Sequence, residues 1–157
     1  ISLCPNVAHA RSEGTVRLRS ADPADTLEVD PRYFTDAEGY DRTVMVAGLK
    51  LMRDIAAQPA LARLIDREWL PGAEVADDES LWQFARRTTN TTYHPAGTCR
   101  MGRADDAMAV VDPQLRVRGI DGLRIADGSV FPSMIGVNLN IPTMMIGEKA
   151  AAMMLET

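Results

Sequence analysis

Residues 93–102 read Tyr93-His94-Pro95-Ala96-Gly97-Thr98-Cys99-Arg100-Met101-Gly102. The chain has only two histidines, and one of them lies here. Pro95 biases His94 toward an extended backbone and Gly97 permits a tight turn, so the segment can fix one imidazole at the tip of a loop. A histidine beside a proline is, however, also common in ordinary loops. This segment indicates a catalytic site only if other parts of the sequence agree with it.

A second segment reads Ile125-Ala126-Asp127-Gly128-Ser129-Val130-Phe131-Pro132. An apolar strand is expected to end here in a carboxylate and a glycine. Asp127 followed by Gly128 suits a ligand whose phosphate or hydroxyl groups approach the backbone closely. The same pair is also typical of a plain turn at the end of a strand. By itself, the segment leaves both interpretations open.

A third segment reads Gly136-Val137-Asn138-Leu139-Asn140-Ile141-Pro142-Thr143. A helix is predicted from Ile141 to Leu155, with Asn140 as its N-cap and Pro142 in its first turn, where a missing N–H costs little. The N-terminus of a helix carries about +0.5 of an elementary charge and free N–H donors. It therefore suits an anion or a group that becomes negative during a reaction. Simple capping by Asn140, with Asn138 in an exposed turn, explains the segment equally well.

The rest of the chain predicts an α+β fold. Short strands are expected at Gly14–Arg19, Leu27–Val29, Thr98–Met101, Leu115–Arg118 and Leu123–Ala126. The last two flank an Asp-Gly turn signal at 121–122. Helices are expected from a capping box at Thr35–Glu38 to about Ala57, at Ala60–Trp69, and at Glu79–Arg87 with Asp78 as N-cap.

Composition excludes several classes of protein. The chain has 157 residues, 46% apolar and 25% charged, which is typical of one soluble domain and not of a disordered or collagen-like chain. A net charge of -5 argues against a nucleic-acid-binding surface. No run of about 18 apolar residues predicts a transmembrane helix. Cys4 and Cys99 are too few for a disulfide scaffold or a Cys-rich zinc site, so we expect no metal and a reducing, cytoplasmic setting.

Taken together, the three segments resemble the C-terminal signature of the glucose–methanol–choline (GMC) family of flavin-dependent alcohol oxidoreductases. The run Y-H-P-A-G-T-C-R-M-G is similar to the family's first catalytic segment. A-D-G-S-V-F-P followed by N-L-N-I-P-T-M-M-I-G-E-K-A-A is similar to the second. The details are closest to the choline dehydrogenase-like branch, where the second catalytic position is Asn. The earlier runs G-T-V-R-L-R-S and D-P-R-Y-F also match, so the resemblance covers most of the chain.

The resemblance implies a role for each matching residue. His94 is expected to be the general base that takes the hydroxyl proton of an alcohol, a role that suits imidazole because it titrates near neutral pH. Asn138 is expected to share a hydrogen bond with the substrate oxygen. The cofactor implied is FAD, which would be contacted by Tyr93, Asp127, Gly128, Asn140 and Thr143. Apart from the resemblance, Arg100 has two possible roles: an electrostatic element of the site or, as is more common, a structural arginine that pairs with a carboxylate, which is the role we expect.

The family binds FAD through an N-terminal G-x-G-x-x-G turn, and this sequence has none. The resemblance therefore implies a C-terminal piece, with residues 1–106 in the substrate-binding domain, an antiparallel sheet with packing helices. Residues 107–157 would lead the chain back to the FAD-binding domain. This returning segment would carry the active-site Asn and supply the last strand and helix of that domain. The missing FAD domain is then a partner, and the piece alone is not expected to retain FAD.

Two further functions stay open at this point. One is a lyase on the same FAD scaffold, with His94 as its acid or base, and the other is a non-catalytic binding module. The predicted terminal helix is apolar on nearly every face, which favours packing into the missing domain or association into a homo-oligomer. Neither the identity of the alcohol nor the electron acceptor can be predicted from these residues.

Overall fold

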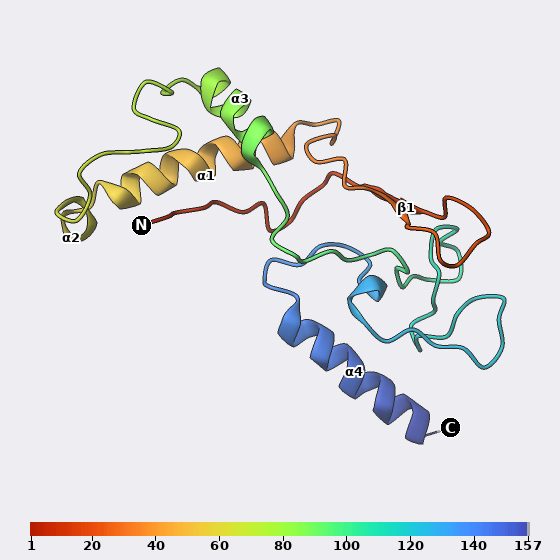
Figure 1. Cartoon of the computed structure of the whole chain (residues 1–157). Coiled ribbons are helices and arrows are strands. Elements are labelled where there is room, and N and C mark those ends of the chain that lie inside the picture. Colours follow the sequence, from red (N-terminus) through yellow and green to blue (C-terminus); the bar gives the residue numbers. More distant parts are fainter. Residues whose placement is uncertain (157) are drawn as a thin grey trace. The chain divides into compact units, whose positions relative to one another are not determined.

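The computed structural model describes residues 1–156 and divides them into two compact units (Figure 1). The first unit contains residues 1–14 and 31–90, and the second contains residues 15–30 and the chain from Thr91 onward. Helices and one small antiparallel sheet make up the regular structure. The predicted α+β fold class is therefore confirmed. No helix of the described residues has both the length and the hydropathy needed to cross a membrane.

The first unit is helical and is built on the pairing of α1 (Tyr40–Ala56) with α3 (Asp78–Thr88). Its buried core consists of Val46, Leu81, Trp82 and Ala85. Phe34 adds an edge-to-face contact with Trp82, with ring centroids 4.8 Å apart. The short helix α2 (Pro59–Ala62) is shorter than the predicted Ala60–Trp69.

The starts of these helices differ from the predicted caps. The capping box at Thr35–Glu38 does not form, because the Thr35 hydroxyl donates to Arg32 O and Glu38 pairs with Arg11. The N-cap of α1 is Gly39, and the Asp36 carboxylate accepts the N–H of Tyr40 at 2.6 Å. For α3 the N-cap is Asp77 and not Asp78; its carboxylate accepts the N–H groups of Glu79 and Ser80 at 3.0 and 2.9 Å.

The second unit begins with a two-stranded antiparallel sheet. Strand β1 (Thr15–Arg17) pairs with β2 (Glu28–Asp30), and Val16 lies opposite Val29. Strand β1 lies within the predicted range 14–19. Strand β2 overlaps the predicted range 27–29 and extends one residue beyond it.

The other three predicted strands form only isolated bridges. The segments at 99–101, 110–111, 116–118 and 123–125 are nonetheless joined by backbone hydrogen bonds, such as the Val117 N–H to Leu123 O at 2.9 Å. Regular pairing is interrupted because Leu115, Gly119 and Gly122 have positive φ angles of 64°, 77° and 74°. A left-handed residue turns the chain away from an extended path.

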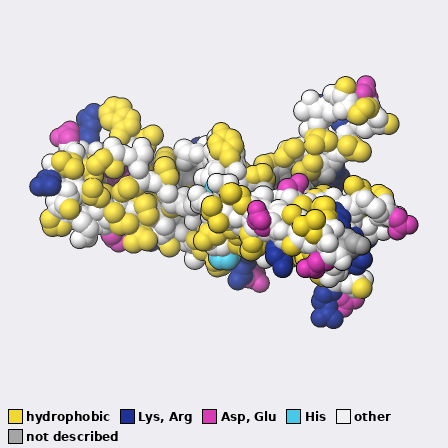
Figure 2. Space-filling view, turned by 90° about the horizontal axis from the view of Figure 1, so that it is seen from below, with side chains coloured by type: hydrophobic (Ala, Val, Ile, Leu, Met, Phe, Trp, Pro, Cys, Tyr) yellow, Lys and Arg dark blue, Asp and Glu magenta, His cyan; other side chains and the backbone are white. Residues whose placement is uncertain are grey.

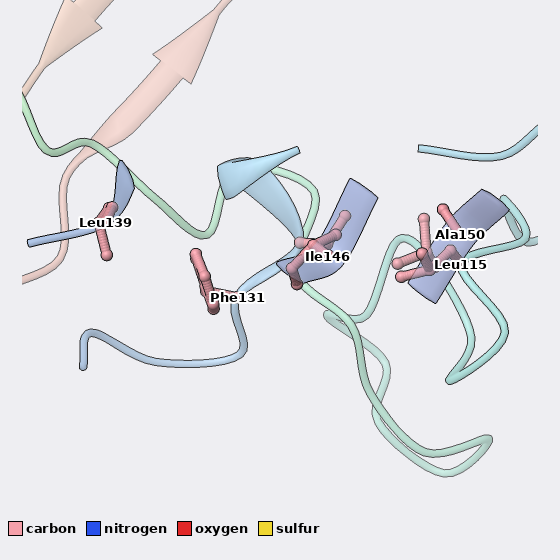
Figure 3. Close-up of a cluster of buried hydrophobic side chains, with 7 residues drawn as sticks. Leu115, Phe131, Leu139, Ile146 and Ala150 are labelled. Atoms are coloured by element: carbon pink, nitrogen blue, oxygen red, sulfur yellow. The ribbon is translucent and has the colours of Figure 1, made fainter. Parts of the chain in front are cut away.

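The core of the second unit packs against the C-terminal helix α4 (Asn140–Leu155) (Figure 3). Its buried members are Val111, Leu115, Val130, Phe131, Leu139, Ile146 and Ala150. The predicted cap of this helix is wrong by one residue, since Asn140 is its first residue and Leu139 is the N-cap.

Apart from the exposed Glu148 and Lys149, the remaining faces of α4 are largely apolar, and many of their side chains are exposed. The large exposed side chains on this helix are Ile141, Met144, Met145, Met154 and Leu155. Hydrophobic side chains also lie at the surface over much of the space-filling view (Figure 2). The prediction that this chain does not cover every apolar face of its terminal helix is therefore confirmed.

Candidate active site

The three motif segments meet at Gly128. A Cβ built on Gly128 would lie 3.3 Å from Thr143 Oγ1 and 3.8 Å from Pro95 O. Pro95 follows His94, and Thr143 lies in the first turn of α4. The φ of Gly128 is not in the left-handed region, so close packing, and not the backbone conformation, favours a glycine here. We refer to the contact of Gly128 with Thr143 and Pro95 as the Gly128 junction.

Backbone hydrogen bonds hold the first two segments side by side. Cys99 N–H donates to Ser129 O at 3.0 Å, and Met101 N–H donates to Val130 O at 2.8 Å. Gly97, with φ of 82°, brings the chain close to the same segment, since its Cβ position is 3.4 Å from Phe131 O. The residues after His94 therefore run along the residues after Asp127.

His94 is half-buried between two residues with restricted backbones. Pro95 follows it, and Tyr93 before it has a left-handed φ of 63°. That conformation is uncommon for a bulky residue, and such strain clusters at functional sites. The Tyr93 N–H donates to Thr91 Oγ1 at 2.9 Å, and the Tyr93 side chain is 82% exposed. The backbone on both sides of His94 therefore has few available conformations, which restricts the position of its imidazole.

Asp127 caps the short 3-10 helix η1 (Gly128–Val130). Its Oδ1 accepts the Ser129 N–H at 2.8 Å. Hydrogen bonds from the Ser129 side chain and then from its N–H lower the pKa of Asp127 below the ordinary value. The carboxylate is therefore charged at neutral pH, and its capping bond fixes the backbone at Gly128.

Asn138 and Asn140 flank a buried residue at the start of α4. Leu139 is 5% exposed and anchors the turn in the core, while both asparagines are exposed. Thr143 is half-buried, and its N–H donates to Leu139 O at 2.8 Å. The structure thus brings Gly128, Thr143 and the His94 segment together, whereas Tyr93 and Asn138 present exposed side chains.

Sequence reasoning missed one residue near this site. Arg100 is a structural arginine as predicted, because its Nη2 donates to both carboxylate oxygens of Asp106 at 2.9 and 3.1 Å. A hydrogen bond from Met108 N–H and a second from Arg100 lower the pKa of Asp106 below its ordinary value. Arg118 was not predicted to matter, yet it donates to three backbone carbonyls beside this pair. No side-chain pattern signals such contacts, because the acceptors are main-chain atoms.

The region around the Gly128 junction is suited to one edge of a flat ligand on which negative charge develops. It offers a backbone with no side chain, a hydroxyl at Thr143, and the N-terminus of a 16-residue helix, whose dipole favours negative charge. Across residues 1–156, no three or more His, Cys, Asp or Glu side chains are grouped to hold a metal ion. The hydroxyl of Thr143 and the N-terminus of α4 are compatible in their chemistry with one edge of a flavin.

Comparison with known proteins identifies the family of this chain. The family profile described as GMC oxidoreductase matches residues 10–147. Choline oxidase of Arthrobacter globiformis is 59% identical over 150 residues, which is 96% of this chain and 28% of that protein. Mitochondrial choline dehydrogenase of Homo sapiens is 45% identical over 143 residues, or 89% of this chain and 23% of that protein.

A solved structure extends the likeness to the fold. The crystal structure of pyridoxine 4-oxidase from Mesorbium loti superposes with a TM-score of 0.87 at 32% identity, covering 96% of this chain and 28% of that chain. This chain therefore spans about a quarter of the length of the proteins that it matches. Since the profile covers most of its residues, the chain belongs to the GMC oxidoreductase family.

Proposed function

We propose that this chain is the C-terminal part of an FAD-dependent enzyme that oxidises the CH–OH group of an alcohol to a carbonyl. The observation that carries the proposal is the Gly128 junction, where the His94 segment, the Asp127-Gly128 turn and the N-terminus of α4 meet. Membership of the GMC family supports it.

The cofactor implied by the family is FAD, which, when bound, supplies the hydride acceptor of the reaction. In this chain the residues proposed to hold it are Tyr93, Asp127, Gly128, Asn140 and Thr143. The close packing of Thr143 and Pro95 O against Gly128 places the N-terminus of α4 beside the Asp127-Gly128 turn. The dipole of α4 stabilises negative charge at that N-terminus. These contacts form one edge of the site, and the proposed N-terminal FAD domain completes it.

The two proposed catalytic residues, His94 and Asn138, have different roles toward the alcohol. His94 accepts the hydroxyl proton as general base, while the hydride leaves from the adjacent carbon. The side-chain amide of Asn138 donates a hydrogen bond to the substrate oxygen, which becomes negative as the proton departs. The strained backbone at Tyr93 and the ring of Pro95 limit the positions of His94 and so reduce the entropy lost in the reaction.

We propose choline as the first substrate to test, supported by the 59% identity with choline oxidase and the 45% identity with choline dehydrogenase. The assignment of residues 1–106 to a substrate domain and 107–157 to the returning segment stays a prediction. So do the cytoplasmic location and association into a homo-oligomer.

The test is anaerobic mixing of the full-length, FAD-loaded protein with choline, followed by flavin absorbance. Alcohol oxidation predicts bleaching of the flavin. A matched control is 3,3-dimethyl-1-butanol, in which carbon replaces the charged nitrogen, and it separates recognition of the cation from oxidation of the alcohol. A lyase would leave the flavin oxidised with both compounds, and a binding module would yield no flavoprotein.

A further inference from the structure

The side chain of Arg118 holds the turn at residues 102–106 by hydrogen bonds to the main-chain carbonyl groups of that turn. Its Nη1 donates to Asp106 O at 2.9 Å, and its Nη2 donates to Gly102 O at 2.9 Å and also to Arg103 O. Hydrogen bonds from a charged donor are about twice as strong as neutral ones. A single half-buried side chain therefore fixes the backbone of the 102–106 turn.

The 102–106 turn also holds the side chain of Arg100 in place, through Asp106. Asp106 accepts two hydrogen bonds from Arg100 Nη2, and its Oδ1 also accepts the Met108 N–H at 2.9 Å. Arg100 Nε is buried and has no hydrogen-bond partner among the described residues. Because an unpaired buried N–H is unfavourable, Arg100 depends on the Asp106 pair to stay in place.

Gly102 shows how tightly this turn is packed. A Cβ at Gly102 would lie 2.7 Å from Asp106 Oδ2 and 2.7 Å from Ala109 Cβ. Any side chain here would push against the carboxylate that holds Arg100. The position of the Asp106 carboxylate is therefore set both by the Arg118 clamp and by the absence of a side chain at Gly102.

Residues 99–101 connect this turn to the proposed active site. On one edge Arg100 O accepts the Val110 N–H at 2.9 Å. On the other edge the N–H groups of Cys99 and Met101 donate to Ser129 O and Val130 O, directly after Gly128. A shift of Arg100 would therefore reach both the Gly128 junction and His94, which lies six residues before Arg100 in the same segment.

We infer that Arg118 is a positioning residue that fixes the His94 segment through the 102–106 turn and Arg100. Its catalytic consequence rests on the proposed function, in which His94 is the base. Its structural consequence, a fixed segment at residues 99–101, does not depend on that function. The two consequences can be measured separately.

The catalytic test uses Arg118→Met in the full-length, FAD-loaded enzyme with saturating choline. Because a misplacement of about 1 Å can slow a reaction about 10²-fold, anaerobic flavin reduction should slow by roughly 10-fold to 100-fold. KM should change little, since Arg118 contacts the protein's own backbone. Arg118→Lys keeps a charged donor for these carbonyls and should recover part of the rate.

Arg116→Met is the matched control. Arg116 lies two residues away, and its side chain donates to Asp112 Oδ2 at 2.8 Å and to Gln114 Oε1 at 3.4 Å, both outside the 102–106 turn. Because the Arg116 side chain is exposed, its loss should leave flavin reduction near the wild-type rate. If Arg118→Met does not fold, Gly102→Ala disturbs the same turn with the clamp intact and should give the same kinetic pattern.

The structural test is alkylation of Cys99 under native conditions, followed by mass spectrometry of its peptide. Cys99 is half-buried beside Arg100, and exposed Cys4 is the internal reference. Arg118→Met should speed the alkylation of Cys99 about tenfold relative to Cys4, which corresponds to about 1.4 kcal/mol of lost protection. Arg116→Met should not change this ratio.

Two results would overturn the inference. In one, Arg118→Met lowers only the melting temperature, and both flavin reduction and Cys99 alkylation match the Arg116 control. In the other, alkylation speeds up while the rate of flavin reduction stays at the wild-type value. If instead His94→Ala retains the wild-type rate, the proposed function fails, and the alkylation ratio alone decides whether Arg118 holds the segment.

Discussion

Adding a methyl group at Gly128 should weaken FAD binding by a predictable amount. In Gly128→Ala the new Cβ would lie 3.3 Å from Thr143 Oγ1, closer than an ordinary van der Waals contact, and 3.8 Å from Pro95 O, which is ordinary. Thr143 is β-branched and lies in a helix, so its hydroxyl has few alternative positions. The neighbours must therefore move by a few tenths of an ångström.

Such mild overpacking costs about 1 kcal/mol, at the lower end of the usual range. If the strain falls on the cofactor-bound state, the dissociation constant of FAD rises about fivefold. Titration of the full-length apoenzyme with FAD, followed by quenching of flavin fluorescence, measures this change.

A double-mutant cycle separates this contact from other effects of the substitution. Thr143→Ala removes the hydroxyl that the new methyl group would meet, so adding Gly128→Ala to Thr143→Ala should leave the FAD dissociation constant nearly unchanged. Gly147→Ala on the same helix is the control, because among the described residues no atom beyond its chain neighbours and the backbone of α4 lies within 4 Å of its Cβ position. It should leave FAD affinity unchanged and stabilise α4, since Ala is a better helix former than Gly.

An additive cycle would refute this reasoning. If Gly128→Ala raises the dissociation constant equally with and without the Thr143 hydroxyl, the two residues do not share the junction in the working enzyme. The same conclusion follows if Gly128→Ala behaves like Gly147→Ala.

Two further predictions concern the chain by itself. Because hydrogen bonds lower the pKa of Asp106 and Asp127, both carboxylates stabilise the fold above about pH 4, and this stability is lost as pH falls through their lowered pKa values. Urea unfolding from pH 6 down to pH 2 should show that loss, and Asp106→Asn with Asp127→Asn should reduce it; an unchanged acid dependence would contradict the assignment. The purified 157-residue chain should lose FAD on desalting and self-associate through α4, and Met144→Lys with Met145→Lys should reduce association. Stable flavin absorbance, or a monomer at high concentration, would contradict this.

Helices with strong local signals were predictable from the sequence. The expected helix from Ile141 to Leu155 differs from α4 only by its first residue. At α3 the cap differs by one position because Asp77 and Asp78 are adjacent and either carboxylate can cap a helix. The local pattern therefore located these elements but did not select one residue as the cap.

Long-range contacts explain the elements that were missed. The predicted helix at Ala60–Trp69 stops at Ala62, and beyond it Arg53 of α1 binds Glu68 and Gly72 O, both at 3.0 Å. These contacts to α1 hold the segment in a non-helical path, against its helical pattern. The 99–101 segment likewise pairs with distant residues that no local pattern identifies.

The candidate site was predictable only as a set of motifs. Each of the three segments had an ordinary explanation by itself, and their resemblance to one family joined them. The Gly128 junction adds what that resemblance did not contain, a tight contact that favours a glycine. The role of Arg118 could not be predicted from the sequence, because its hydrogen-bond partners are backbone carbonyls whose positions depend on the completed fold.

Anaerobic flavin reduction by the His94→Ala variant of the full-length enzyme measures directly whether this imidazole takes the substrate proton. The rate should fall by roughly 10²-fold to 10⁴-fold, the usual contribution of a positioned acid–base group. FAD should stay bound, because its proposed contacts lie at other residues. Asn138→Ala should slow the reaction less, because it removes a hydrogen bond and leaves the base. A His94→Ala enzyme that is less heat-stable but reduces its flavin at the wild-type rate would show that His94 only braces the loop before Pro95, and the proposed catalytic role would be wrong.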